Sequence, residues 1–375
     1  MRNSARKLSA IIRRDPVLSI SGLLAVLSIA FVPPDREYLN YIDYKVLICL
    51  FALMIAVELL QEARLFAAAA GLLINRVHGL RRMTLVLTAM TFFSSMILTN
   101  DVALLTFVPL TLIIGRVLED RKALIRMVVL QTIAANTGSL LTPIGNPQNL
   151  YIYTHGGLSW ADFWSAVWPI GLAGGVLLVL CIAVAPDASL QARLQAEPVR
   201  RGRNLVLSLI LFPLAVACVF GLFSEWLLLA AVVILLLPWQ KKIFLRADYS
   251  LLLTFVFFFV FIGNISRLPA LRDTAVHWLN SPCRVVLAGS LLSQVISNVP
   301  AAILLSGFTV HWRELLRGVD VGGCGTLIAS LASVISWRLF SREEAAPQAR
   351  TRYLAVFSGY NLIFLIVLLA AALIF

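Results

Sequence analysis

Residues 83–115 read MTLVLTAMTFFSSMILTNDVALLTFVPLTLIIG, a long apolar run that is interrupted once, at Thr99-Asn100-Asp101. A single helix of this length would measure about 50 Å, while the hydrocarbon core of a membrane is about 30 Å thick and two full spans would need more residues. Arg81 and Arg82 precede the run and Arg116 follows it, so both ends are predicted to lie on one side. The run is therefore predicted to be a re-entrant helical hairpin, with its turn at residues 99–101.

A second apolar run, at residues 283–308, reads CRVVLAGSLLSQVISNVPAAILLSGF and is interrupted at Ser297-Asn298-Val299-Pro300. In both runs the polar side chains at the interruption are predicted to cap the second half-helix, since Ser, Thr, Asn and Asp bond free backbone N–H groups there. Pro300 suits a first helical turn. Counting spans places the ends of this second hairpin, at about 283–309, on the face opposite to the first. The two hairpins should then approach the midplane from opposite faces.

A helix rich in glycine and polar residues follows each hairpin. The first lies at about 127–150 and contains TPIGNPQN at 142–149, and the second lies at about 319–337 and contains GGCGTLIAS at 322–330. Glycine permits tight backbone turns, and proline removes a hydrogen-bond donor, so both are predicted to be broken transmembrane helices. The break residues predicted to border a site are Asn136, Thr137, Gly138, Ser139, Thr142, Pro143, Gly145, Asn146, Asn149, Gly323, Gly325, Thr326 and Ser330.

The composition identifies an integral membrane protein, because 60% of the residues are hydrophobic and only 13% are charged, against roughly 25% charged in soluble domains. Besides the hairpins, about nine spans are predicted. The net charge of +12 does not indicate a nucleic-acid partner, because the positions of the basic residues match the predicted topology. With a cytoplasmic N-terminus, most basic residues lie in the inner connectors, in accord with the positive-inside rule. The outer connectors keep only Arg36, Lys45, Arg267, Arg272, Arg284, Arg313 and Arg317 of the 31. The predicted spans are 17–32, 43–60, 127–150, 163–185, 204–222, 224–239, 250–264, 319–337 and 352–375.

Paired interruptions at corresponding places in two halves of a membrane protein indicate the substrate site of a transporter. Irregular backbone at membrane depth is tolerated only where protein or a water-filled cavity satisfies it, so the four interruptions should line one cavity. Asp101 is the only acid deep in an apolar segment, and such residues are usually functional. We expect it to take part in ion or proton coupling as well as capping, with Na⁺ possible at Asn100, Asp101 and Asn298. Asp320, at a predicted helix start, is expected to cap.

Other sequence features argue against a metalloprotein, an enzyme or a primary pump. The five cysteines lie singly in or beside apolar segments and are expected to be buried thiols, and no metal site or cofactor is predicted. There is no HExxH or GxSxG motif and no nucleotide-binding loop, so neither an enzyme nor a primary pump is expected. An ion channel remains an alternative. Residues 62–82 and 266–280 are predicted to be helices lying in the membrane interface.

At the four interruptions the chain resembles the ion transporter superfamily, which includes divalent anion:sodium symporters, citrate transporters, arsenite permeases and a group of Na⁺/H⁺ antiporters. Thr99-Asn100-Asp101 and Ser297-Asn298-Val299 match the Ser-Asn-Thr tips that bind Na⁺ and carboxylate in the symporters, and residues 142–149 match the Gly-Thr-Pro-Pro-Asn break. Neither tip is a complete Ser-Asn-Thr. The departures favour the arsenite-permease and antiporter branches. The resemblance implies a homodimer.

The sequence thus predicts an all-α polytopic membrane protein with two inverted-topology repeats, each with a re-entrant hairpin and a broken helix. The first repeat is assigned to residues 1–186, a cytoplasmic linker to 187–203 and the second repeat to 204–375. The predicted function is secondary active transport of a small inorganic or organic anion, coupled to Na⁺ or H⁺ by alternating access. The closest alternative is a Na⁺/H⁺ antiporter. The predicted location is a bacterial-type inner membrane, with the N-terminus cytoplasmic and the C-terminus outside.

Overall fold

The computed structural model describes residues 16–116, 118, 120–189, 198–344 and 346–375, and these residues form helices without strands. The basic N-terminal residues and the centre of the predicted linker, at 190–197, lie outside the described residues. The α-helices are α2 (Pro16–Ile29), α3 (Tyr44–Glu62), α4 (Leu65–Ile74), α5 (Leu80–Leu98), α6 (Asn100–Gly115), α7 (Arg121–Ser139), α8 (Pro147–His155), α9 (Trp160–Ala183), α10 (Arg203–Val219), α11 (Glu225–Leu236), α12 (Tyr249–Ser266), α13 (Pro269–Trp278), α14 (Pro282–Ile296), α15 (Asn298–Ser306), α16 (Trp312–Gly322), α17 (Leu331–Glu343) and α18 (Pro347–Ile374). Two short 3₁₀ helices, η1 (Arg36–Leu39) and η2 (Lys241–Arg246), precede α3 and α12.

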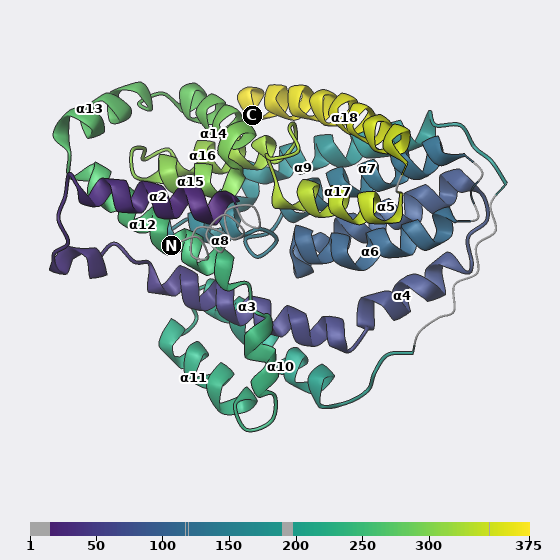
Figure 1. The fold of residues 1–375 in the computed structure, drawn as a ribbon, viewed down its shortest axis with the longest axis horizontal. Coiled ribbons are helices and arrows are strands. Elements are labelled where there is room, and N and C mark those ends of the chain that lie inside the picture. Colours follow the sequence, from purple (N-terminus) through teal and green to yellow (C-terminus); the bar gives the residue numbers. More distant parts are fainter. Residues whose placement is uncertain (1–15, 117, 119, 190–197, 345) are drawn as a thin grey trace, which may run out of the picture.

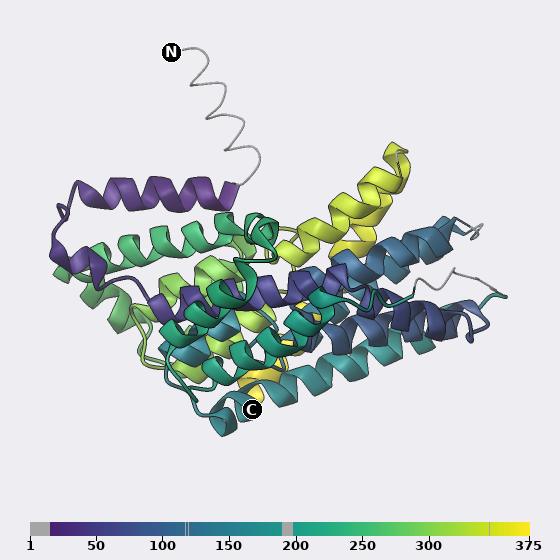
Figure 2. The same cartoon turned by 90° about the horizontal axis from the view of Figure 1, so that it is seen from below.

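Both predicted hairpins are present as pairs of helices joined at one residue. α5 and α6 meet at Thr99, and α14 and α15 meet at Ser297. The two helices of each pair pack against each other. Figure 1 shows the two hairpins on opposite sides of the centre of the molecule, with α5 and α6 on the right and α14 and α15 on the left, and Figure 2 gives the view turned by 90°. Both interruptions that the sequence predicts therefore fall at the turns of helical hairpins.

Both predicted broken helices are present as well. α7 ends at Ser139 and α8 begins at Pro147, while α16 ends at Gly322 and α17 begins at Leu331. The second break differs from its prediction at one residue, because Asp320 lies in the last turn of α16 rather than at a helix start. The helix begins earlier, at Trp312, and is strongly amphipathic, so a search for apolar runs detects only its end.

Each broken helix packs closely on the hairpin that precedes it, α7 on α5 and α16 on α14. Glycines make these approaches possible. A Cβ on Gly138 would lie 2.1 Å from the Phe92 carbonyl oxygen, and one on Gly318 would lie 2.6 Å from the Val286 carbonyl oxygen. Real Cβ atoms essentially never come within 3.0 Å of such atoms. The hairpin and the broken helix of each half are therefore fitted to each other backbone to backbone.

Helices occupy all nine predicted spans, but they differ in length. Among the described residues, α9, α12 and α18 are long and apolar enough to cross a membrane by themselves. A fourth candidate combines residues 36–62 with α4, bent by 49° at the break between them, where Arg64 takes a left-handed conformation with φ of 57°. α4 and α13 fall in the two segments predicted to lie in the interface.

The five cysteines are free thiols, and one of them corrects the sequence-based expectation of burial. Cys49, Cys218 and Cys324 are buried and Cys181 is half-buried, whereas Cys283 is exposed. Cys283 occupies the second position of α14, at the end of the hairpin. It therefore stands outside the packed core.

Candidate functional site

The turn residues Thr99 and Ser297 adopt the same unusual backbone conformation. Thr99 has φ of 77° and ψ of 153°, and Ser297 has φ of 75° and ψ of 156°. This region is essentially restricted to glycine, and occupying it costs of order 1–3 kcal/mol. With Arg64 they are the non-glycine residues of positive φ in the described parts of the chain. Strain repeated at equivalent points of two hairpins indicates a conformation that the surrounding structure imposes.

Backbone hydrogen bonds hold the two tips in matching ways. The Asn100 N–H donates to the Gly145 carbonyl at 3.2 Å, and the Asn298 N–H donates to the Ala329 carbonyl at 3.0 Å. Each tip is thus fastened to the break of its own half. The next N–H of each helix, from Asp101 and from Val299, donates to the side-chain oxygen of Asn100 at 2.9 Å and of Asn298 at 3.0 Å.

These bonds correct two expectations about the tips. Thr99 and Ser297 make no side-chain capping bond, and their positive φ differs from the extended backbone of an ordinary capping residue. Asp101 is the second helical residue and not a cap. Most first-turn N–H groups already donate hydrogen bonds to protein acceptors. An anion at the tips would therefore be bound mainly by side-chain amides and not by free backbone N–H groups. The Asn298 Nδ2 group has no hydrogen-bond partner within the described chain and lines the cavity described next.

Asn136, near the end of α7, joins the two halves. Its Oδ1 accepts hydrogen bonds from Asn100 Nδ2 at 3.1 Å and from Ser330 Oγ at 3.0 Å, and its Nδ2 donates to the Gly323 carbonyl at 3.1 Å. One buried amide therefore contacts the first tip and both ends of the second break. The sequence predicts Asn136, Gly323 and Ser330 as site residues, and the structure brings them together.

The two tips line one cavity of about 90 Å³, here called the tip cavity. A water molecule needs about 10–15 Å³ of such space, so the cavity holds several waters or a small ion with part of its hydration shell. The two tip asparagines, Asn100 and Asn298, both line it. The predicted residues that line it are Asn100, Asp101, Ser297, Asn298, Pro300 and Ser330, joined by Val17, Pro147, Gln148, Asp248, Leu251, Thr254, Val299 and Leu331.

Asp101 and Asp248 both line the tip cavity and come from different helices, α6 and the N-terminal cap of α12. Asp248 uses one carboxylate oxygen to cap α12 through the Leu251 N–H, at 3.0 Å. The Asp101 Oδ1 is buried and has no partner among the described residues. Two carboxylates on one small cavity attract a cation, and the sequence analysis did not include Asp248 among the site residues.

A second cavity of about 240 Å³, the side cavity, shares Asp101, Pro147 and Asp248 with the tip cavity. Thr99 and Asn146 line it, and it extends along α3 to Glu58. Beyond it lies an open depression of about 700 Å³, the basic vestibule. The vestibule is lined by Glu58, Gln61, Glu62, Ala63, Arg64, Arg200, Arg201, Gly202, Arg203, Asn204, Gln240 and Arg246.

Arg246 stands between the side cavity and the basic vestibule and lines both. Its Nη1 pairs with Glu58 Oε1 at 2.8 Å and with Glu62 Oε1 at 2.6 Å. The three depressions therefore form a series that leads from the tips to a surface rich in arginine. A positively charged mouth of this kind raises the local concentration of anions.

The remaining predicted site residues shape the two breaks without lining the tip cavity. Thr142 Oγ1 donates to the Met96 carbonyl at 2.6 Å, and Asn149 Nδ2 donates to the carbonyls of Ser139, Leu140 and Thr142. In the second break, Gln294 Oε1 accepts from the Thr326 N–H at 2.8 Å. Several other predicted residues also lie in or beside the breaks, namely Thr137, Gly138, Pro143, Gly145 and Gly325, the last with φ of 122°.

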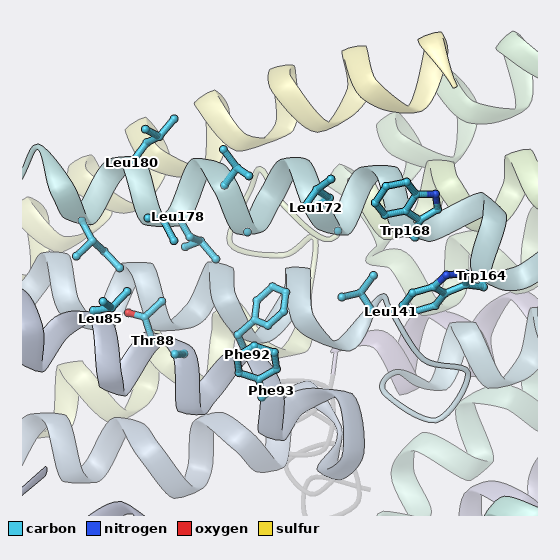
Figure 3. A pocket seen from close by; sticks show the side chains of 16 residues that line it. Leu85, Thr88, Phe92, Phe93, Leu141, Trp164, Trp168, Leu172, Leu178 and Leu180 are labelled. Carbon is cyan, nitrogen blue, oxygen red and sulfur yellow. The ribbon is translucent and has the colours of Figure 1, made fainter. Parts of the chain in front are cut away.

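An apolar groove of about 530 Å³ between α5 and α9 offers a contrast (Figure 3). Phe92, Phe93, Trp164 and Trp168 line it, with leucines of both helices and with Thr88 as the hydroxyl-bearing side chain. It presents no charged group to a ligand. An anion would lose its hydration there without compensation, so the groove is not the candidate site.

Comparison with known proteins agrees with this geometry. Residues 8–312 match the family described as "Citrate transporter". The chain is 31% identical to an uncharacterized transporter of Methanocaldococcus jannaschii over 96% of both proteins, and 33% identical to an inner membrane protein of Escherichia coli over 82% of this chain and 83% of that protein. A silicon efflux transporter of rice is 33% identical over 210 residues, which are 52% of this chain and 42% of that protein. The protein is thus an integral multi-pass membrane transporter, not an enzyme, and belongs to the citrate transporter family of the ion transporter superfamily.

Proposed function

We propose that this protein is a secondary active transporter that moves a small anion, of the carboxylate or oxyanion class, together with Na⁺ or H⁺ by alternating access. The observation that carries the proposal is the tip cavity, where two hairpin tips of the same conformation meet around polar side chains. The family name and the name of the rice relative, a silicon efflux transporter, are consistent with small oxygen-rich cargo.

The cavity offers separate groups for an anion and for a cation. Asn298 Nδ2 and the remaining N–H of the Asn100 amide can donate hydrogen bonds to an anion, aided by the partial positive charge at the starts of α6 and α15. The carboxylates of Asp101 and Asp248 face the same space. The Asn100 Oδ1 accepts one backbone N–H and keeps a lone pair for Na⁺, whereas the Asn298 Oδ1 accepts the Val299 N–H and, at 3.5 Å, the Ser297 hydroxyl.

Charge explains why the two ions should travel together. Two carboxylates repel an anion in a small space of low dielectric constant, where unit charges interact much more strongly than in water. A bound Na⁺ or proton removes part of this repulsion, so the anion binds well only after the cation. This order of binding is the thermodynamic basis of coupled transport, because the anion's affinity depends on the cation.

The same carboxylate pair supports a second candidate, a Na⁺/H⁺ antiporter. In that case Asp101 and Asp248 would bind Na⁺ and protons in turn, and no anion would be required. The basic vestibule favours the anion transporter, because a mouth lined by five arginines attracts an anion, which an antiporter would not carry.

We further propose that residues 1–186 and 204–375 are inverted repeats joined by a linker at 187–203, that both hairpins are re-entrant, that the N-terminus is cytoplasmic and the C-terminus outside, and that the protein is a homodimer. The matched tips at Thr99 and Ser297, the matched fastening bonds and the matched breaks support the repeats. The bias of arginine and lysine supports the orientation. Family resemblance supports the dimer.

The proposal is tested by uptake into proteoliposomes with imposed Na⁺ and pH gradients, using a panel of citrate, shorter dicarboxylates, arsenite and silicic acid. We expect one anion or oxyacid to be concentrated by a cation gradient in the native protein, and Asp101→Asn to lose that dependence. Currents far above carrier turnover without coupling would instead identify a channel. Na⁺/H⁺ exchange with no cargo would identify the antiporter, and unchanged coupling in Asp101→Asn would refute the role of Asp101.

A further inference from the structure

A buried acid outside the tip cavity is the starting point. Asp320, in the last turn of α16, is 3% exposed. Its Oδ1 accepts a hydrogen bond from Gln148 Nε2 at 3.2 Å, and its Oδ2 is buried with no partner among the described residues. A buried carboxylate needs a cation or several hydrogen-bond donors to remain charged. Asp320 has one neutral donor.

The neighbouring amide of Asn149 lacks a donor in the same way. Its Nδ2 is committed to the three carbonyls of Ser139, Leu140 and Thr142, which fixes the orientation of the amide. Its Oδ1 is buried without a partner among the described residues, and the Asn149 side chain lies within hydrogen-bonding reach of the Asp320 carboxyl. Two neighbouring side chains therefore each hold a buried acceptor oxygen without a donor, and one shared proton would satisfy both.

We propose that Asp320 carries a proton on Oδ2, which donates to Asn149 Oδ1, and that Asp320 is a second coupling site of the transporter, specific for H⁺. The coupling role rests on the proposed function, but the protonation of Asp320 does not. Na⁺ is disfavoured there, since it would need further oxygen ligands and the amide nitrogen of Gln148 already faces the carboxyl.

Gln148 connects this site with the tip cavity. It is the second residue of α8, it lines the tip cavity beside Asp101 and Asp248, and its amide bonds Asp320 behind it. Displacement of the Gln148 side chain would open the carboxyl to water in the cavity. The proton would then pass from Oδ2 to a cavity water and leave a carboxylate. A proton would return from water once the cavity opens to the opposite face of the membrane.

No basic side chain among the described residues pairs with Asp320 to supply a compensating charge. Arg317, one turn earlier, donates its Nε to the Ala166 carbonyl. The Cys324 thiol lies close enough to Asp320 to feel its charge. The helices packed on α16 contribute the following titratable residues along their lengths: Tyr151, Tyr153 and His155 on α8, Asp162 and Cys181 on α9, Cys283 and Arg284 on α14, and Arg350, Arg352, Tyr353 and Tyr360 on α18, with none on α15.

Infrared spectroscopy of the purified protein tests protonation without requiring transport. At neutral pH the native protein should show the C=O stretch of a buried protonated carboxylic acid, shifted in D₂O. Asp320→Asn should lose that band, Gln148→Leu should shift it because Oδ1 loses its donor, and Asp273→Asn, at an exposed acid on α13, should leave it unchanged. Absence of the band in the native protein, or a difference spectrum between the native protein and Asp320→Asn that shows no lost C=O band, would overturn the proposal; the comparison removes any contribution from Asp101.

Transport then tests coupling. In proteoliposomes, Asp320→Asn should still exchange labelled anion for unlabelled anion at equal pH. The stimulation of its uptake by an imposed pH gradient should be at least tenfold smaller than in the native protein. An undiminished response would overturn the coupling role. If instead the native protein exchanges no anion while the infrared band is present, the proposed function fails and the protonation of Asp320 stands.

Discussion

Replacing Asn136 by alanine should destabilise the protein markedly, because this side chain joins the first tip to both ends of the second break. The substitution removes three hydrogen bonds, from Asn100 Nδ2, from Ser330 Oγ and to the Gly323 carbonyl. A typical buried hydrogen bond contributes about 1 kcal/mol net, and an orphaned partner costs more. The expected loss is therefore about 3 kcal/mol in the free energy of unfolding.

Asn361 on α18 provides a matched control. It is fully buried, like Asn136, but its Nδ2 makes one hydrogen bond, at 2.9 Å, to the Phe357 carbonyl of its own helix. Asn361→Ala should cost about 1 kcal/mol by the same reasoning. The two variants should therefore differ by about 2 kcal/mol, which corresponds to roughly a 30-fold difference in the unfolding equilibrium.

Unfolding of both variants is measured by titrating detergent-solubilised protein with a denaturing detergent and following tryptophan fluorescence. The eight tryptophans give an adequate signal. If Asn136→Ala and Asn361→Ala fall within about 0.5 kcal/mol of each other, the hydrogen bonds from Asn136 do not join the two halves. A double variant with Asn100→Ala should lose less than the sum of the single losses, because both remove the same bond.

Further predictions concern the tips, the connector after α9 and the vestibule. Thr99→Gly should raise the free energy of unfolding by about 1 kcal/mol by relieving the positive φ, whereas Thr99→Ala should not, and equal midpoints of unfolding would contradict the strain. The pKa of Asp187 is lowered by hydrogen bonds from the N–H groups of Arg81 and Ala188 and by nearby arginine charges. Its carboxylate therefore stabilises the fold above its ordinary pKa of 3.8, and this stabilisation is lost as the pH falls through the lowered pKa. Asp187→Asn should lower the melting temperature at pH 7 but not in strong acid. Arg246→Gln should raise KM for the anion in uptake assays. Its free energy of unfolding should fall by less than about 1 kcal/mol, because the ion pairs are half-exposed. Arg272→Gln serves as the control.

The hairpin turns could be located from sequence to the residue. Thr99 and Ser297 stand where polar residues interrupt long apolar runs, and an interruption of that kind has few places in a membrane fold. The breaks after Ser139 and Gly322 could be located for the same reason, since proline and glycine clusters end helices. In each case the signal is local, and local signals survive without knowledge of the tertiary packing.

Residues that reach the site from distant elements could not be predicted. Asp248 stands between a basic connector and α12 and resembles an ordinary helix cap, which it also is. Gln148 is one polar residue among several in the first break. Asp320 was expected to cap a helix, because the amphipathic start of α16 was missed. Their roles depend on which elements pack together, and one sequence does not contain that information.

The bonds from Asn100 to Gly145 and from Asn298 to Ala329 constrain how the site can change sides. A tip swinging out alone, like a flap, would break a buried main-chain bond and part the glycine-fitted surfaces of α5 and α7 or of α14 and α16. A hairpin carried along with its broken helix breaks neither. Alternation of access should therefore move whole helical blocks, with their joints at distant bends such as the one at Arg64.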